Sequence, residues 1–181
     1  MTVEPRVRAT AAMTDFPIDL YEVNAMDRAA FVAAFGDVAE SARWVAAEAE
    51  AERPFANRDA MISTFANAVA GADAERQMAL LSAHPELASR AGMTDASAQE
   101  QRSAGLDRLT PAEFDRFKRL NAEYRKRFGF PFILAVRHAT KDEILVALAA
   151  RLKNPPAAEF ARALVEVQRI IRFRTEDRVA P

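Results

Sequence analysis

The sequence predicts an all-α protein, and two observations support this fold class. Alanine, which has the highest helix propensity, accounts for 40 of the 181 residues, whereas glycine occurs only 5 times. Apolar side chains recur at steps of three and four along most of the chain, which is typical of helices that bury one face. At this length we expect a single compact multi-helix domain.

The first half of the chain is expected to hold a tail followed by four helices. Residues 1–15 show no apolar period, so we expect a flexible N-terminal tail and a folded domain over residues 16–181. The predicted helices end at capping or helix-breaking residues such as Gly36 and Pro54. They cover Met26–Phe35, Ser41–Glu52, Asp59–Val69 and Glu75–Ala83.

The longest helix is predicted over Pro111–Phe128. Thr110 is its expected N-cap, Pro111 suits the first helical position, and Glu113 completes a capping box. The helix should bury one apolar stripe, which consists of Phe114, Phe117, Leu120, Tyr124 and Phe128.

A second capping box, from Thr140 to Glu143, opens another helix. This helix ends at Asn154-Pro155-Pro156, because two consecutive prolines cannot continue it. A last helix follows, and its spacing places four apolar residues on the inner face: Phe160, Leu164, Val167 and Ile171.

The apolar segment 128–137 interrupts the helical pattern. Its sequence, Phe128-Gly129-Phe130-Pro131-Phe132-Ile133-Leu134-Ala135-Val136-Arg137, has no helical period, and Pro131 disfavours helical geometry at the residue before it. Buried main-chain N–H and C=O groups are almost always paired, so a dry segment between helices needs partners. Two interpretations stay open: a short buried strand that fills the core, or a pocket wall whose main-chain groups face a polar ligand.

The composition argues against several function classes. The absence of cysteine excludes disulfides, thiolate metal sites and a cysteine nucleophile. The 25 basic and 26 acidic residues give a net charge of −1, which argues against a nucleic-acid partner. No apolar run reaches membrane-spanning length and the N-terminus lacks the apolar core of a signal peptide, so we expect a cytoplasmic protein without membrane contact.

His84 is a candidate acid–base residue. It and His138 are the only histidines, and no zinc, phosphate-loop or serine-hydrolase motif is present, so neither a metal nor a cofactor is expected. Pro85 disfavours helical geometry at His84, which places this histidine at a rigid corner after a helix. Such a residue is either a held proton donor with a pKa near neutrality, or a helix cap or surface side chain.

Two further polar groups also allow two interpretations each. Ser97-Ala98-Gln99-Glu100-Gln101 has the spacing of a capping box, but polar residues follow it where apolar ones would normally seat a helix. Arg174, just after the Ile170-Ile171 pair of the last helix, is either a solvent-exposed residue or an inward-facing anion clamp. The basic residues between 116 and 127 are interleaved with Glu113, Asp115 and Glu123, which indicates a solvated helix face.

Three motifs, taken together, resemble one enzyme family. They are His84-Pro85-Glu86-Leu87, Ser97-x-x-Glu100-Gln101 and Phe128-Gly129-Phe130-Pro131-Phe132-Ile133. Their order and separations resemble 2-oxo-4-hydroxy-4-carboxy-5-ureidoimidazoline (OHCU) decarboxylase, the last step of the urate-to-allantoin route. The resemblance extends from about Phe16 to Val179 and includes Leu20-x-x-Val23-Asn24 and Ile170-x-x-Phe173-Arg174-x-x-Asp177. Thr175 and Arg178 depart from it, because the family usually has aliphatic residues there.

The resemblance implies an all-α fold and a role for each motif. His84 is then the proton donor, with Glu100 and Arg174 as further catalytic residues. The other substrate-binding residues that it implies are Pro85, Ser97, Ala98, Gln99, Gln101 and the main chain of Phe132, Ile133, Leu134, Ala135 and Val136. The role of Arg137 is left open. The implied partner is a small ureidoimidazoline, bound by a homodimer that uses neither a metal nor a cofactor.

The function implied by the resemblance is cofactor-independent decarboxylation of OHCU to (S)-allantoin and CO2. Loss of the carboxylate leaves an enolate-like charge that main-chain N–H groups, Arg174 or His84 can stabilise, and protonation from one face gives one enantiomer. Glu100 is expected to hold the ureido N–H groups and to raise the pKa of His84.

Two alternatives stay open. One is a non-enzymatic helical interaction module, in which His84 and residues 97–101 only cap helices. The other is a lyase or hydrolase that acts on a related ureido compound. The C-terminal Val179-Ala180-Pro181 is not a peroxisomal signal, which favours the cytoplasm as the location.

Overall fold

The structure is a computed structural model that describes residues 17–89 and 93–181. Within these ranges the chain forms nine α-helices and no strand, so the all-α prediction is confirmed. An isolated parallel bridge joins Ile18 to Val179: Ile18 N donates to Arg178 O (2.7 Å) and Ala180 N donates to Ile18 O (2.9 Å). The tail predicted over residues 1–15 lies outside the described residues.

The first half of the described chain contains five helices. Four of them confirm the predicted helices, with ends that differ by one or two residues, and side-chain oxygens of aspartate or asparagine cap three of these four. The additional helix was missed because it has only six residues and buries only Val23. The helices are α1 (Leu20–Ala25), α2 (Arg28–Phe35), α3 (Arg43–Glu50), α4 (Arg58–Gly71) and α5 (Ala74–Ser82).

The second half contains α6 (Asp95–Ser103), α7 (Pro111–Phe128), α8 (Lys141–Arg151) and α9 (Pro156–Arg178). The capping boxes predicted at Thr110 and Thr140 are both confirmed. Gly129 ends α7 at φ 83°, in the left-handed region that favours glycine. The capping-box interpretation of Ser97 is wrong, because Thr94 caps α6 and Ser97 lies inside the helix.

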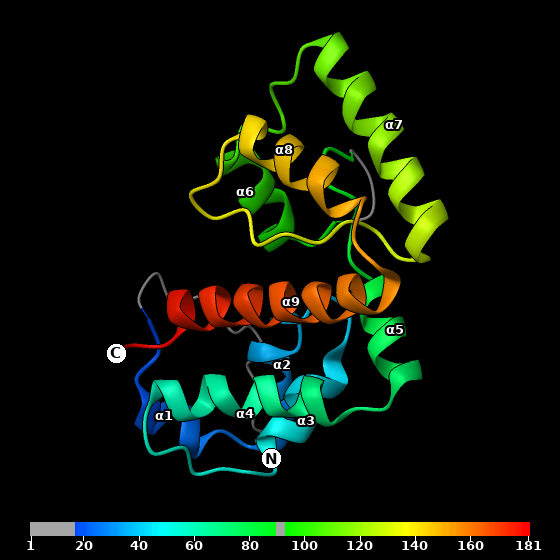
Figure 1. Ribbon diagram of the computed structural model, residues 1–181. Coiled ribbons are helices and arrows are strands. Elements are labelled where there is room, and N and C mark those ends of the chain that lie inside the picture. Colours follow the sequence, from blue (N-terminus) through cyan, green and yellow to red (C-terminus); the bar gives the residue numbers. More distant parts are fainter. Residues whose placement is uncertain (1–16, 90–92) are drawn as a thin grey trace, which may run out of the picture.

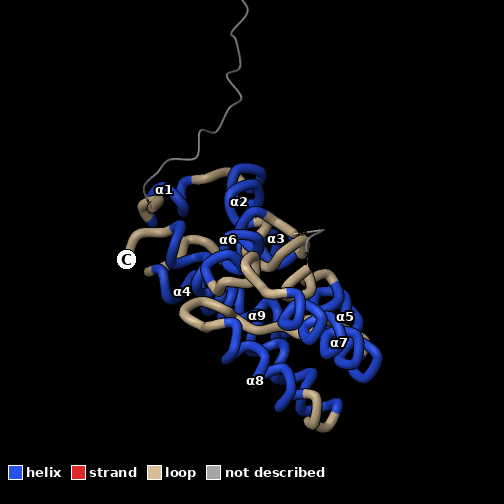
Figure 2. The backbone as a smooth tube through the Cα atoms, turned by 90° about the horizontal axis from the view of Figure 1, so that it is seen from above, coloured by secondary structure: helices blue, strands red, loops and turns tan. Residues whose placement is uncertain are grey.

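Helix α9 runs through the middle of the molecule (Figure 1). Helices α1 to α4 lie on one side of it and α6, α7 and α8 on the other. α4 packs along α9, and α5 and α7 also contact it. Figure 2 shows that loops, not strands, join the helices of the described chain. No helix in residues 17–89 or 93–181, α9 included, is both long and apolar enough to cross a membrane.

Two aromatic clusters form the centres of the two sides. Phe31 and Phe35 of α2 contact each other (ring centroids 4.9 Å apart) and pack against Phe65 of α4 (6.3 Å from each). The second cluster gathers around Tyr124 of α7 and includes Phe128, Phe130, Phe132 and Phe160. Because two of these rings belong to the non-helical segment after α7, the second cluster fixes that segment against the helices.

Glu113 makes the stability of this fold depend on pH. Its carboxylate pairs with Lys141 of α8 (2.6 Å) and accepts the main-chain N–H of Thr110 (2.8 Å), and these contacts lower the pKa of Glu113 to about 2 from the usual 4.5. Because this pKa is lowered in the folded state, the Glu113 carboxylate stabilises the fold above pH 4.5. This stabilisation is lost as the pH falls towards 2. We expect Glu113→Gln to melt below the wild type at neutral pH, with a difference that shrinks over this range.

Thermal melts of the two proteins across this pH range measure the effect. Glu123→Gln, at an exposed position of the same helix, is the matched control and should show no such pH-dependent difference. An equal melting difference between Glu113→Gln and the wild type at every pH would contradict the assignment of this stability to the Glu113 carboxylate.

Candidate active site

The described residues enclose a small pocket beside α9. It has a volume of about 20 Å³, which is room for about one water molecule. Its lining comes from the turn after α2, the loop after α5, α6, the non-helical segment after α7 and α9. The lining residues are Glu40, His84, Pro85, Leu87, Ser97, Glu100, Gln101, Phe132, Ile133, Leu134, Val136, Ile170 and Arg174.

His84 lies just after α5 and is held in one orientation. The helix ends at Ser82, as Pro85 predicts, and the histidine is 5% exposed. Its Nδ1 lies 2.8 Å from the carbonyl oxygen of Leu80. Because a carbonyl only accepts, we assign the hydrogen to Nδ1, which makes Nε2 an acceptor in the neutral ring. Nε2 is buried and has no hydrogen-bond partner among the described residues.

The pKa of His84 lies below its usual value of 6.5. Burial is the largest cause, because it disfavours the charged imidazolium. The hydrogen bond to Leu80 O and the negative charges of Glu40 and Glu100 raise this pKa, while the charge of Arg174 lowers it further. Glu100 therefore acts in the expected direction but is outweighed by burial. His84 rests as a neutral imidazole whose Nε2 can accept a proton.

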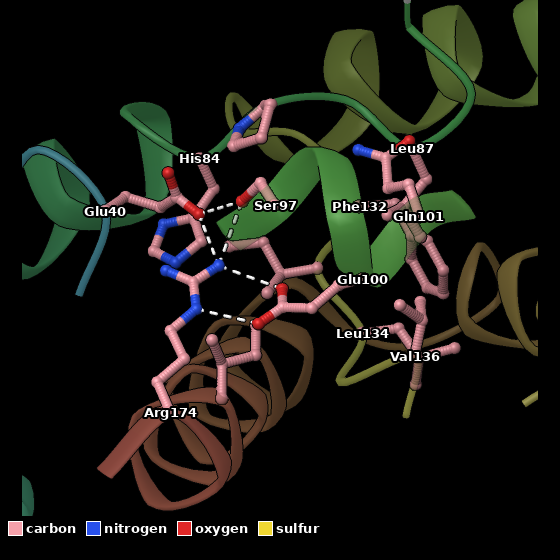
Figure 3. A pocket seen from close by; sticks show the side chains of 13 residues that line it. Glu40, His84, Leu87, Ser97, Glu100, Gln101, Phe132, Leu134, Val136 and Arg174 are labelled. Carbon is pink, nitrogen blue, oxygen red and sulfur yellow. Dashed lines mark hydrogen bonds and ion pairs between the residues drawn. The ribbon is translucent and has the colours of Figure 1, made fainter. Parts of the chain in front are cut away.

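Arg174 of α9 joins the polar residues of the pocket (Figure 3). It is 3% exposed and faces inward. Its Nε and Nη2 donate to the two carboxylate oxygens of Glu100 (2.8 and 2.9 Å). Nη2 also lies 2.7 Å from Glu40 Oε1 and 2.9 Å from Ser97 Oγ, and Nη1 donates to Asp37 O (3.1 Å). Arg174 is thus largely engaged by protein acceptors and fixes the position of Glu100.

Glu40 completes this cluster, and the sequence analysis missed it. It is 3% exposed and has φ 55°, a left-handed conformation that few residues other than glycine adopt. Its carboxylate accepts hydrogen bonds from Arg174, Ser97 and Thr94. No motif marks Glu40 among the 26 acidic residues, because the nearest partner of its carboxylate in the sequence is 54 positions away.

The charges of this cluster do not cancel. Burial raises the pKa of Glu40, but the charge of Arg174 and the hydrogen bonds from Ser97 and Arg174 outweigh it, so this pKa lies below its usual 4.5. Two carboxylates, those of Glu40 and Glu100, then share one guanidinium. The pocket therefore has one net negative charge beside a neutral His84.

Gln101 of α6 lines both this pocket and a second cavity. Its Oε1 accepts the main-chain N–H of Ala88 (2.9 Å), and its Nε2 lies 3.1 Å from the sulfur of Met93. The second cavity, of about 300 Å³, lies against the same glutamine.

The non-helical segment after α7 forms one wall of the pocket; we call residues 130–136 the wall. It pairs with no strand within the described chain. Arg151 of α8 donates to Ile133 O (2.8 Å), and Ala135 N donates to Glu166 of α9 (3.0 Å). The N–H and C=O of Leu134, between them, bond to no described residue. Of the two interpretations of this segment, the pocket wall is the one that the structure supports.

Three residues that the resemblance implied in substrate binding do not line the pocket. Ala98 faces the second cavity, and Gln99 is exposed on α6. Ala135 is buried, and its N–H donates to Glu166, which does not line the pocket either.

Several other residues singled out in the sequence also lie outside the pocket. Arg137 pairs with Asp177 and stacks over the ring of Phe173, with its guanidinium carbon 4.5 Å from the ring centroid. His138 is exposed. The two departures from the family pattern do not line the pocket either; they are Thr175 and Arg178. No group of three or more histidines and carboxylates in the described ranges is placed to hold a metal ion.

Comparison with known proteins agrees with the three motifs. The sequence model described as OHCU decarboxylase matches residues 24–176. The chain belongs to the OHCU decarboxylase family. The OHCU decarboxylase of Haloferax volcanii is 44% identical over 161 residues, which are 89% of this chain and 96% of that protein. The OHCU decarboxylase of Halalkalicoccus jeotgali is 43% identical over 88% of this chain and 91% of that protein.

The fold is also similar to that of a protein with a solved crystal structure. A crystal structure of (S)-allantoin synthase matches with a TM-score of 0.73 and 29% identity, over 91% of this chain and 54% of that one. The family membership expected from the motifs is therefore confirmed. The pocket of this OHCU decarboxylase family member brings together residues from all three motifs and adds Glu40 to them.

Arg174 should be the most sensitive residue of the cluster. Removing its charge leaves Glu40 and Glu100 buried together without a counter-charge, so we expect Arg174→Gln to lower the free energy of unfolding by about 3–5 kcal/mol at neutral pH. Because the pKa of Glu40 is lowered in the folded state, its carboxylate stabilises the wild type above pH 4.5. This stabilisation is lost as the pH falls further. The difference between the two proteins should therefore narrow as the pH falls through 4.5.

Urea unfolding at several pH values measures this difference. Arg172→Gln is the control, because Arg172 lies on the same helix but pairs with Asp59 and Glu176 at the surface. It should cost about 1 kcal/mol or less. Equal losses for the two variants would show that the buried cluster contributes no more than a surface ion pair.

Proposed function

We propose that this chain decarboxylates OHCU to (S)-allantoin and CO2, with His84 as the group that carries the proton. The observation on which this proposal depends is the state of His84: a buried, neutral imidazole with Nδ1 bound to Leu80 O and Nε2 without a described partner. Membership of the OHCU decarboxylase family supplies the substrate. The proposal includes a homodimer and a cytoplasmic location, which the resemblance implies.

The substrate binds between α6 and the wall. Arg174 holds both oxygens of Glu100, and the side chain of Glu100 remains 25% exposed, so its other lone pairs can accept the N–H groups of the ureido substituent. The main-chain groups of Leu134, which bond to no described residue, hold the opposite side of the ring. Because the substrate is much larger than a water molecule, its binding displaces side chains of the lining, Gln101 among them.

The reaction needs one group that first accepts and then donates a proton. The bond from ring carbon 4 to the carboxylate breaks, CO2 leaves, and the electron pair spreads over carbons 4 and 5 and the ring nitrogen next to carbon 5. His84 Nε2 takes the proton of the 4-hydroxyl group, so that carbon 4 becomes a carbonyl, and then delivers this proton to carbon 5. The ring nitrogen takes a second proton from water, which completes the balance of one proton consumed.

The cluster assists this chemistry without binding the departing carboxylate. The pocket has one net negative charge, so it does not neutralise the carboxylate of the substrate. Loss of CO2 removes the charge of that carboxylate. Glu100 fixes the ring through its ureido group, while His84 lies on one side of the pocket. Proton delivery then occurs on one face of the ring and gives a single enantiomer.

His84→Asn tests the proposal. With OHCU generated in situ from urate, we expect the wild type to form (S)-allantoin faster than the spontaneous reaction, followed by circular dichroism, and the variant to lose this stereospecific turnover. His138→Asn, which changes the exposed histidine, is the control and should keep it. Racemic product at the spontaneous rate from the wild type would instead support an interaction module or another ureido substrate.

The pH profile of kcat/KM tests the direction of proton transfer. A group that must be neutral in the free enzyme, with its pKa lowered below 6.5, gives activity that falls only on the acid side of 6.5 and stays level above it. A fall in kcat/KM as the pH rises through neutrality would instead indicate a histidine that must start as the imidazolium.

A further inference from the structure

The wall has two anchors that do not line the pocket, and both are buried charged side chains. Arg151, which is 8% exposed, donates to Ile133 O (2.8 Å). Glu166, which is fully buried, accepts the N–H of Ala135 (3.0 Å). Burial of a charge costs free energy unless it is paired, so an apolar residue would be the simpler choice at either place. Their presence beside a pocket wall suggests that the main-chain contacts matter.

The two anchors act on alternate residues of the wall. In an extended chain, the polar main-chain groups of residues two positions apart point to the same side, and those of the residue between them point to the other. Ile133 and Ala135 use their groups on the outer side. Leu134 lies between them, lines the pocket and has no described partner for its N–H or C=O. The anchors therefore leave the main-chain groups of Leu134 directed at the pocket.

Glu166 is also held in place itself. Its Oε1 lies 2.7 Å from Arg162 and 3.3 Å from Arg169, and the side chains of both arginines are about half exposed (50% and 49%). Oε2 is the oxygen that accepts from Ala135. Arg169 also lies 3.3 Å from Oε2, so only the pairing with Arg162, through Oε1, is separate from the hydrogen bond to the wall.

We propose that Glu166 is a positioning residue: by accepting the N–H of Ala135 it sets the rotation of the wall, so that the N–H and C=O of Leu134 face the bound substrate. This role rests on the proposed function, because it takes the wall as a substrate-binding surface. Glu166 touches neither the substrate nor His84 and acts only through the main chain. Its removal should therefore weaken substrate binding more than it slows the chemical step.

Two conservative variants separate the hydrogen bond from the charge. Glu166→Gln keeps an oxygen that can accept from Ala135 but loses the charge that pairs with the arginines. Glu166→Asp keeps the charge but is one methylene shorter and cannot reach Ala135. We expect Glu166→Gln to keep most of the wild-type kcat/KM, and Glu166→Asp to lose about tenfold or more, chiefly through a higher KM. Arg162→Ala is the control for the charge pairing, because Arg162 pairs with Oε1 and not with the oxygen that accepts from Ala135, and it should leave both constants unchanged.

Each outcome decides between specific explanations. An active Glu166→Asp with an inactive Glu166→Gln would overturn the proposal, because the charge would then be what matters. A lower kcat at unchanged KM in Glu166→Asp would also overturn it, since that is the effect of a smaller folded fraction. If this variant does not fold, Glu166→Leu, which fills the space without an acceptor, replaces it. A wild type without OHCU decarboxylase activity would refute the proposed function itself, whatever the variants do.

Discussion

The site depends on one interaction, the guanidinium of Arg174 between the carboxylates of Glu40 and Glu100. Arg174 belongs to α9, Glu40 to the turn after α2, and Glu100 to α6. The interaction therefore joins elements from both sides of the central helix α9. A buried arginine is tolerated because nearly every direction of its fork meets an acceptor. The same contacts hold the active-site side of α6 against α9 and fix Glu100 at the edge of the pocket.

This cluster also sets the conditions for His84. The nearby carboxylates favour the imidazolium, but burial outweighs them, and the ring rests neutral with its Nδ1 hydrogen bound to Leu80 O. A histidine in this state begins as a proton acceptor and becomes a donor only after it has taken a proton. The resemblance alone had implied a proton donor. The proposed mechanism therefore adds an earlier step, in which the substrate hydroxyl supplies the proton.

The sequence predicted most helices because their signals are local. The capping boxes at Thr110 and Thr140 involve residues three positions apart, and the ends of α7 follow from Pro111 and Gly129. Contacts between distant residues carry no such signal: Glu40 and Glu166 are acidic residues without a motif, and each acquires its role through partners more than 30 positions away. Ser97 was misassigned as a possible cap for the same reason, since Thr94 caps the helix equally well on local grounds and only Glu40 and Arg174 show why Ser97 is buried.

The proposed chemistry depends on a neutral His84 ring with its hydrogen on Nδ1. Side-chain nitrogen NMR of isotope-labelled histidine tests it most directly, because the chain has only two histidines and His84→Asn assigns the signals. We expect a Nδ1–H tautomer for His84 that becomes cationic only below pH 6.5, with exposed His138 as the internal reference. An imidazolium at neutral pH, or a hydrogen on Nε2 of the neutral ring, would contradict it.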